Sequence, residues 1–559
     1  MGFAHDYLSA VLQRSRVPME PTRFEPDWSD RPRKGKFYPG VDSFPLPDAG
    51  SLTGATLEQG LYPPPAMPES RFSLPLLGDM LLHSYGLTGR RLGVQSNSDL
   101  PALPFYTEAN WSRGTASGGA LYPVSTYWVS GPGGPMTPGV HHYSTTHHTM
   151  ERLLTGDVSG IVRDTLGGLE AAQHTDQFLV LGVKYWTNSF KYNSFCYHVV
   201  SMDVGALLQT WRLWARARGL RIEPALWFDE RELARLLGLP DGEEGVFAVI
   251  PLTWERPGAT GGAEPVRRNT LPTGAGAPAA RRAAPAAKPP RADNRPAAAT
   301  VRQLDSERSR RTQRFEAVQR MHEATLDGAT DRPEPTALAP AAATNAAAGM
   351  GRRSLPAPLS VGMEVRQALR ERRSSFGRFD ACRPMRAEEL STVLSALAAV
   401  SLDSDATGVG GPALLKIYAF VNHVRDIEPA VYAYDSVDRD LRIVRPGNSG
   451  DFLQRNYFLS NYNLEQAGAV IVPTIRAEAV LDAVGDRGYR LVNATVGALA
   501  QTLYTVAAAL GLGGGVALGF DNCSYIEELG LSGTGEAPLL ITMIGREDQL
   551  AADVRYEIA

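Results

Sequence analysis

A compact cluster of cationic and hydroxyl side chains lies in the C-terminal part of the chain, within LRERRSSFGRFD. Arg372, Arg373 and Ser374 are consecutive there and offer two guanidinium groups and a hydroxyl to one ligand. A phosphate group needs several charge-assisted donors of this kind. We therefore predict an anion clamp at these residues. Arg546, near the C-terminus, is a further cation in the same part of the chain.

A loop with a hydroxyl and two adjacent glycines lies in the N-terminal part, in RGTASGGALYP. Its candidate ligand-binding residues are Arg113, Ser117, Gly118 and Gly119. Glycines allow the backbone to approach a flat ligand closely. We therefore predict that this loop sets backbone N–H groups against the edge of a ring.

A second glycine run, LGLGGG, follows an apolar segment of the C-terminal part. We expect Gly513, Gly514 and Gly515 to form a turn close to the same kind of flat ligand. The run is not a dinucleotide-binding fingerprint, because it lacks the GxGxxG spacing and follows a helix rather than a strand.

The N- and C-terminal parts read as two copies of one domain. VGALLQTWRLWARARGL (204–220) aligns without gaps with VGALAQTLYTVAAALGL (496–512), at an offset of 292 residues. The same offset relates PALWFD (224–229) to VALGFD (516–521). The period is far too long for a solenoid, so the repeat predicts two like domains packed as an intramolecular pseudo-dimer.

Each copy combines strand-like segments with one long amphipathic helix, at 203–218 and 494–510. We therefore predict a mixed α+β fold for both copies, the first at 1–255 and the second at 356–559. Residues 256–355 are rich in Ala and Pro and contain one polar helical stretch. Such a composition offers little to bury and predicts a flexible linker.

The two copies have diverged in complementary ways. The C-terminal copy alone carries the Arg-Arg-Ser cluster, the glycine run and Arg546. The N-terminal copy alone carries the Ser117 loop and a Lys-Tyr pair, Lys184 and Tyr185, which follows the strand-like QFLVLGV. This division predicts one composite ligand site at the interface between the copies, with the second equivalent site lost.

Charge and composition exclude several classes of protein. The net charge is −4, which gives no general electrostatic basis for binding nucleic acid. The 3 cysteines lack the spacing of a disulfide framework or a zinc site, and we predict no metal. Residues 491–520 are uncharged and long enough to span a bilayer, but their polar side chains and glycines favour a buried helix, a turn and a strand. The N-terminus lacks the apolar core of a signal peptide, so we expect a cytoplasmic protein that does not bind a membrane.

SGGALYP, the Lys-Tyr pair, ERRS and LGLGGG together resemble the FMN-dependent nitroreductase fold, and within it the SagB-type azoline dehydrogenases. Those enzymes act beside YcaO cyclodehydratases on ribosomal peptides. The resemblance covers most of both copies and omits the linker. It implies FMN at the interface between the copies, bound by the Arg-Arg-Ser cluster, glycine turn and late cation of one and by the Ser-Gly loop of the other. The basic residue that usually follows Arg-Arg-Ser is out of register here, at Arg378.

The resemblance also implies a reaction. Lys184 and Tyr185 become the catalytic pair that removes a proton from a thiazoline or oxazoline while FMN takes a hydride, which leaves a thiazole or oxazole. Tyr185 is the base if the adjacent ammonium favours its phenolate. Lys184 is the base if desolvation lowers its own pKa. The sequence leaves both open.

The segment between this pair and Tyr197 is longer than usual for the family. It either shapes the substrate pocket or forms only a longer loop, and it contains Phe190, Lys191, Tyr192 and Phe195. The expected substrate is an azoline-containing precursor peptide, and the expected partner is a YcaO cyclodehydratase complex. The alternatives are a general NAD(P)H-dependent nitro- or quinone-reductase and a decayed flavoprotein that acts as a peptide-binding scaffold.

Overall fold

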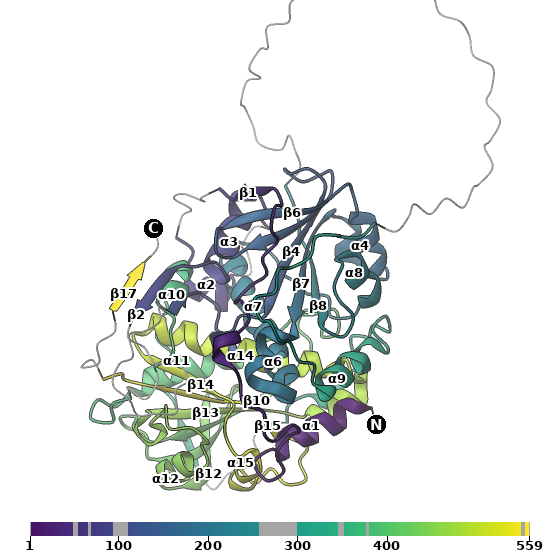
Figure 1. Cartoon of the computed structure of the whole chain (residues 1–559). Helices are drawn as coiled ribbons and strands as arrows, with labels where there is room; N and C mark the ends of the chain where they lie inside the picture. Colours follow the sequence, from purple (N-terminus) through teal and green to yellow (C-terminus); the bar gives the residue numbers. More distant parts are fainter. Residues whose placement is uncertain are drawn as a thin grey trace, which may run out of the picture.

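The computed structural model describes most of the chain as two α+β halves that lie against each other (Figure 1). The described residues are 2–47, 54–64, 69–92, 110–255, 299–344, 351–375, 379–548 and 554–557. The α+β fold and its two copies, both predicted above, are confirmed.

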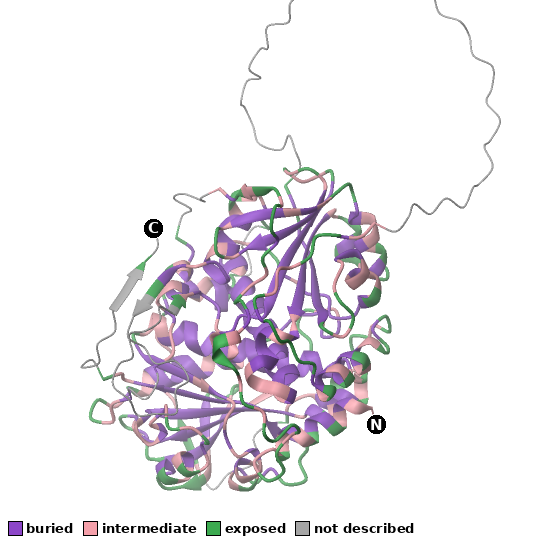
Figure 2. Cartoon of the chain, in the orientation of Figure 1, coloured by how far each residue is buried: buried purple, intermediate pink, exposed green. Residues whose placement is uncertain are grey.

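The N-terminal half is built on a six-stranded antiparallel sheet in the order β1-β6-β5-β4-β7-β8. Almost every residue of its central strands is buried (Figure 2), which explains their continuous apolar sequences. The strands are β1 (Ser43–Pro45), β4 (Val124–Ser130), β5 (Gly139–Ser144), β6 (Thr149–Thr155), β7 (Gln177–Lys184) and β8 (Glu244–Pro251).

The sheet of the C-terminal half repeats this order, as β9-β12-β11-β10-β13-β16, with β14 added at the edge beside β16 and β15 beside β13. The duplication in the sequence is therefore also a duplication of topology. The strands are β9 (Arg352–Ser354), β10 (Leu415–Val421), β11 (Ala430–Asp435), β12 (Asp440–Pro446), β13 (Ala469–Ile475), β14 (Gly513–Ala517), β15 (Ala537–Pro538) and β16 (Ile541–Gly545).

Two long helices, α7 (Cys196–Arg216) and α14 (Gly488–Ala509), cross between the two sheets (Figure 1). A Cβ atom on Gly205 of α7 would lie 2.0 Å from the carbonyl oxygen of Ala494, and one on Gly497 of α14 would lie 2.0 Å from that of Met202. These contacts are related by the 292-residue offset. The crossing is therefore isologous, as at the interface of a homodimer, and it needs glycine at both positions.

Shorter helices pack around this pair. Helices α2 (Leu57–Leu61) and α3 (Leu74–Ser84) contact α7, whereas α10 (Val365–Glu371), α11 (Ala387–Ala398) and α13 (Ala477–Val484) contact α14. By length and composition α14 could cross a membrane, but 94% of its apolar stretch is buried inside the protein. The uncharged residues 491–520 thus form a buried helix followed by a strand, as the sequence predicts.

The two ends of the chain reach across to the opposite halves. The N-terminal helix α1 (Phe3–Gln13) packs on α13 and on α15 (Asn522–Glu528) of the C-terminal half. The C-terminal strand β17 (Val554–Glu557) pairs with β2 (Gly89–Leu92), which also pairs with β3 (Asn110–Ser112). Figure 1 shows β17 lying beside β2. Each half therefore carries an element supplied by the other.

The prediction of a flexible linker at 256–355 needs correction over 299–344 and over 352–354, the strand β9 of the C-terminal sheet. Residues 256–298 lie outside the described residues, but 299–344 pack on both halves and contain helix α9 (Glu316–Leu326). Val301, Phe315 and Met321 are buried, and the Val301 N–H donates to the Leu236 carbonyl at 2.8 Å. The sparse apolar side chains of this segment suffice to hold it, because each enters an existing core.

We predict that Gly497→Ala and Gly205→Ala each lower the stability of the protein by about 1–3 kcal/mol, because the added methyl group would force the central helices apart. The measurement is urea unfolding followed by circular dichroism. Gly160→Ala, in helix α4 (Ser159–Thr165), is the matched control, since nothing lies within 4 Å of its added Cβ. Equal unfolding midpoints for Gly497→Ala and wild type would contradict the role given to the crossing.

Candidate functional site

A cavity of about 460 Å³ lies between the two halves and is lined by both. The N-terminal half contributes the turn η2 (Gly118–Ala120), helix α6 (Tyr185–Tyr192) and α7, and the C-terminal half contributes α14, the end of β14 and the residues that follow α10. Figure 1 places the α7–α14 crossing between the two sheets, and this cavity lies beside it.

The Ser117–Gly119 loop forms one wall of this cavity. The Ser117 hydroxyl donates to Asp203 Oδ2 at 2.6 Å, and the Gly118 N–H donates to Asp203 Oδ1 at 2.8 Å. A Cβ atom on Gly118 would lie 2.3 Å from Val199 Cγ1, and Gly119 has a φ of +63°. The glycines are therefore needed for close packing on α7 and for the turn itself.

A side chain of the other half holds the same loop. Gln501, on α14, accepts the N–H of Ala116 at 2.9 Å and donates to the carbonyl of Gly114 at 3.0 Å. The loop is therefore fixed from both halves, and its position depends on the helix crossing.

The predicted anion clamp lines the same cavity, where Arg372, Arg373 and Ser374 follow α10. The Arg372 guanidinium donates to the Arg113 carbonyl at 2.9 Å and lies over the Tyr504 ring at 5.4 Å. Ser374 shares a hydrogen bond of 2.8 Å with the Tyr504 hydroxyl. The structure thus brings the Arg-Arg-Ser cluster of one copy and the Ser-Gly loop of the other to one cavity.

Two predicted cations do not line this cavity. Arg113 is buried in the N-terminal half, where it donates to the Tyr85 carbonyl at 2.9 Å, and only its carbonyl oxygen touches the clamp, through Arg372. Arg546 pairs with Glu389 at 2.5 Å. Arg378 lies outside the described residues.

The predicted glycine turn needs correction. Gly513, Gly514 and Gly515 belong to strand β14, which pairs with β16, and the turn itself lies at Gly511, with a φ of +64°. A Cβ atom on Gly515 would lie 2.6 Å from the Tyr462 ring, which lines the cavity. These glycines therefore make room for side chains packed on the strand.

The predicted catalytic pair lies in a different place. Lys184 and Tyr185 line a separate cavity of about 310 Å³ beneath the 299–319 segment. Lys184 Nζ lies 2.5 Å from Asp305 and 2.6 Å from Glu307, and the Tyr185 hydroxyl shares a hydrogen bond of 3.0 Å with His322. The structure does not bring this pair to the clamp and the loop, because the end of β7 faces the segment that the sequence assigned to a linker.

The protonation of this pair fits a structural role. Burial raises the pKa of the Tyr185 hydroxyl. Burial alone would lower the pKa of Lys184, but the charges of Asp305 and Glu307 outweigh it, and the pKa is raised. Both side chains therefore hold their protons at neutral pH.

A second Lys-Tyr pair lines the composite cavity instead. Lys191 and Tyr192 lie at the end of α6, seven residues after the first pair. A Cβ atom on Gly119 would lie 2.9 Å from the Tyr192 hydroxyl and 3.3 Å from Lys191 Nζ. Burial and the charge of Asp203 raise the pKa of Tyr192. The signal was present in the sequence, in the segment interpreted as either a pocket wall or a longer loop.

A cation at the N-terminus also enters this cavity. Arg14, just after α1, donates to Asn522 Oδ1 at 2.7 Å, and its guanidinium lies 4.6 Å from the centre of the Phe195 ring. Burial lowers the pKa of Arg14 to about 10. No sequence pattern marks this residue, because only the packing of α1 on the C-terminal half brings it there.

Ionic side chains fill the pseudo-equivalent region. At the position of Tyr504 the N-terminal copy has Arg212, which pairs with Asp403, as does Arg216 at 2.5 Å. Arg212 and Asp403 are buried. Asp405 nearby accepts the N–H of Leu226 at 2.8 Å. The buried Arg212 thus stands at the position of the ring that contacts Arg372 and Ser374 in the other half.

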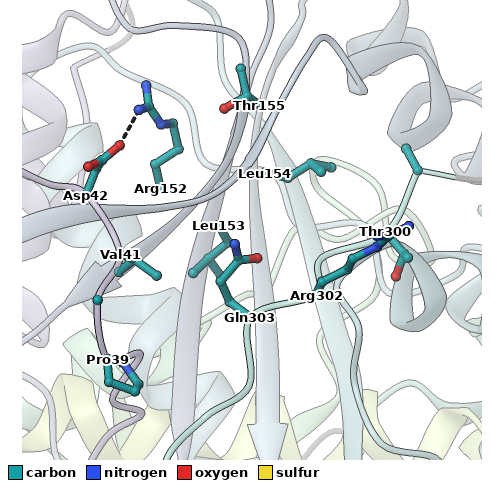
Figure 3. Close-up of a pocket in the computed structure, with 12 residues that line it drawn as sticks. Pro39, Val41, Asp42, Arg152, Leu153, Leu154, Thr155, Thr300, Arg302 and Gln303 are labelled. Carbon is teal, nitrogen blue, oxygen red and sulfur yellow. Dashed lines mark hydrogen bonds and ion pairs between the residues drawn. The ribbon is translucent and has the colours of Figure 1, made fainter.

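A more open hollow of about 680 Å³ lies apart from all these residues, between β6 and residues 299–303 (Figure 3). It contains the Asp42–Arg152 ion pair, and its lining includes none of the residues singled out in the sequence.

Comparisons with known proteins agree with this architecture. The nitroreductase family model matches residues 369–546. A crystal structure from Anabaena variabilis, described as that of a nitroreductase, aligns with 98% of this chain and 100% of its own, at 21% identity and a TM-score of 0.68. One from Ralstonia eutropha aligns with 38% of this chain and 98% of its own, at 20% identity and a TM-score of 0.28. The microcin synthetase McbBCD of E. coli, with truncated pro-MccB17 bound, aligns with 32% of this chain and 71% of its own, at 17% identity and a TM-score of 0.26.

No curated protein matches the sequence. The first structural match takes in nearly the whole of both chains, so the likeness extends to the paired halves and not to one half alone. Residues 369–546 form a nitroreductase-family domain, and the chain as a whole has the nitroreductase-like α+β fold.

Proposed function

We propose that this protein is an FMN-dependent oxidoreductase that oxidises thiazolines or oxazolines of a ribosomally made peptide to thiazoles or oxazoles. The observation that carries the proposal is the meeting of three groups in one cavity between the halves: the Arg-Arg-Ser cluster, the Ser-Gly loop and the Lys191–Tyr192 pair. The nitroreductase-family domain supports the flavin, and the resemblance to the SagB-type enzymes supports the azoline substrate.

The cavity has the features that FMN requires. Arg372 Nε is buried without a hydrogen-bond partner among the described residues, and Arg373 and Ser374 lie beside it in the cavity lining. A phosphate would satisfy such donors. At the other wall, Gly118 and Gly119 line the cavity, in a turn that a flat ring can approach.

The reaction divides between the cofactor and the chain. FMN, when bound, supplies a two-electron acceptor for the hydride of the azoline ring. The chain must orient the substrate and receive its proton. Tyr192, whose pKa is raised, keeps its proton and can donate a hydrogen bond to the substrate. We assign the receipt of the proton to the Lys191 amine, which lies beside Tyr192 at Gly119.

The proposed substrate is an azoline-containing precursor peptide, delivered by a YcaO cyclodehydratase complex. The cavity lining supports a peptide rather than an isolated small ring. Trp111 from the N-terminal half and Phe458 from the C-terminal half are 47% and 48% exposed, and both line the cavity. Partly exposed aromatic rings of this kind can contact the residues that flank a peptide's azoline.

A general NAD(P)H-dependent nitro- or quinone-reductase is the second candidate. The cavity lining favours an anionic co-substrate, because among the described residues it contains Arg14, Lys191 and Arg372 but a single carboxylate, that of Asp203. Bleaching of the flavin by NADPH in the absence of oxygen, without oxidation of an azoline peptide, would support this reductase over the proposed function.

We predict that the chain binds one FMN and that Arg372→Ala with Ser374→Ala weakens binding at least about tenfold, through the loss of charge-assisted hydrogen bonds. Fluorescence titration of the apoprotein measures both the affinity and the stoichiometry. Arg353→Ala is the matched control, because a second Arg-Arg-Ser sequence at Arg352–Ser354 forms the exposed strand β9. Two FMN per chain would contradict the loss of the second site.

We predict that Lys191→Ala with Tyr192→Phe retains FMN but slows azoline oxidation by about 10²–10⁴-fold, the usual contribution of a positioned acid or base. The rate is followed by mass spectrometry, as a loss of about 2 Da for each ring aromatised.

Lys184→Ala with Tyr185→Phe is the control for this prediction, since that pair lines the other cavity. It is expected to oxidise the peptide at the wild-type rate. Slow oxidation by the Lys184 and Tyr185 variant, with a normal rate for the Lys191 and Tyr192 variant, would restore the assignment made from the sequence.

A further inference from the structure

We propose that Asp203 is a positioning residue of this site, whose carboxylate holds the Ser117–Gly119 loop in the conformation that receives the flavin ring. This inference rests on the proposed function and assigns a role to the single carboxylate that the described residues contribute to the cavity lining.

Asp203 makes two hydrogen bonds to the Ser117–Gly119 loop. Its two carboxylate oxygens accept hydrogen bonds from different groups of the loop, the Ser117 hydroxyl at 2.6 Å and the Gly118 N–H at 2.8 Å. Ser117 Oγ in turn accepts the Tyr122 N–H at 2.9 Å. Asp203 thus fixes the start of the turn directly and its far end through Ser117, and with an exposure of 4% it has little water to compete for these bonds.

The position of the loop decides what the catalytic pair contacts. Gly119, at a φ of +63°, lies against Tyr192 and Lys191, with no room for a Cβ atom between them. A shift of the loop would therefore change both the surface offered to the flavin ring and the packing of the proposed proton-transfer pair.

A comparison of the two copies indicates that the fold does not require the Asp203–Ser117 contact. The 292-residue offset places Thr495 opposite Asp203, and the loop of that copy, ATGVGGPAL, has no serine. The Thr495 hydroxyl donates to the Leu491 carbonyl of its own helix at 2.8 Å. By contrast, the glycines of the helix crossing occur in both copies, at Gly205 and Gly497. Of the two copies, only the one whose loop lines the cavity has the Asp203–Ser117 contact.

The surroundings of Asp203 make its hydrogen bonds to the loop sensitive to pH. The titratable groups coupled to it are Tyr85 after α3, Tyr192 on α6 and Cys196 on α7, and burial raises the pKa of all three, so they stay neutral. The cations of the same cavity are Lys191 on α6, Arg14 after α1, and Arg372 and Arg373 after α10. Burial raises the pKa of Asp203 to about 7. Its protonation below that pH would remove an acceptor from the loop.

The test is a fluorescence titration of the apoprotein with FMN between about pH 5.5 and 8.5. In the wild type the Kd is expected to rise as the pH falls through about 7. Asp203→Asn is expected to bind FMN at least about tenfold more weakly at pH 8 and to lose this pH dependence. Thr495→Val, the equivalent position outside the cavity, is expected to bind as the wild type does.

A variant with a milder change protects the test against misfolding. Ser117→Ala removes one of the two hydrogen bonds and keeps the carboxylate, so weaker binding with the pH dependence retained is expected. Wild-type affinity and pH dependence in Asp203→Asn, or wild-type affinity in Ser117→Ala if the first variant does not fold, would overturn the inference while leaving the proposed function intact. A wild-type protein that binds no FMN at any pH would overturn both.

Discussion

The close crossing of α7 and α14 is the constraint on which the rest of the molecule depends. Glycines at equivalent positions let the two backbones touch, which brings the sheets of both halves to fixed distances from a common axis. The composite cavity lies beside this axis, and Gln501, the residue directly after Ala500 of its wall, reaches from α14 to hold the opposite half's loop. A substitution that separated the helices would therefore move both walls of the cavity at once.

Around this axis, equivalent residues of the two copies maintain the packing. Where the two copies differ in sequence, the two sides of the crossing differ in chemistry. Tyr197 accepts from Arg490 at 2.8 Å, and its counterpart Tyr489 shares a 2.7 Å hydrogen bond with His198, so one pairing persists in two chemical forms. Glu230 is buried between Arg487 and Arg490, which lower its pKa to about 2 against the opposing effect of burial. Its counterpart on the cavity side is Asn522, which binds Arg14. One side is a neutralised ionic cluster, and on the other side the neutral amide of Asn522 binds an arginine that lines the cavity.

The fold and the composite nature of the site could be predicted because a comparison of the two copies within the sequence reveals both. The offset identified the crossing helices, and the complementary motifs identified Arg372–Ser374 and the Ser117 loop as walls of one cavity. Motif composition could not distinguish the two Lys-Tyr pairs, because their positions differ by two turns of α6, and only the packing of residues 299–319 shows which pair is covered. The average composition of that segment also did not reveal its few buried apolar residues. The place of Arg14 in the cavity could not be predicted either, because it is set by a contact with a residue more than 500 positions away.

Joining the halves in one chain changes how such a site can evolve. In a homodimer every gene position is expressed twice, so a substitution that closes one cavity closes both. In this chain the anion clamp at Arg372–Ser374 and the Arg212–Asp403 pair are encoded by separate positions, and one could be lost or gained without the other. The covalent link also gives each half a permanent partner, so the shared cavity persists at dilutions that would dissociate two free subunits. Fusion thus frees half of the interface from selection for ligand binding while that interface still supports the other half.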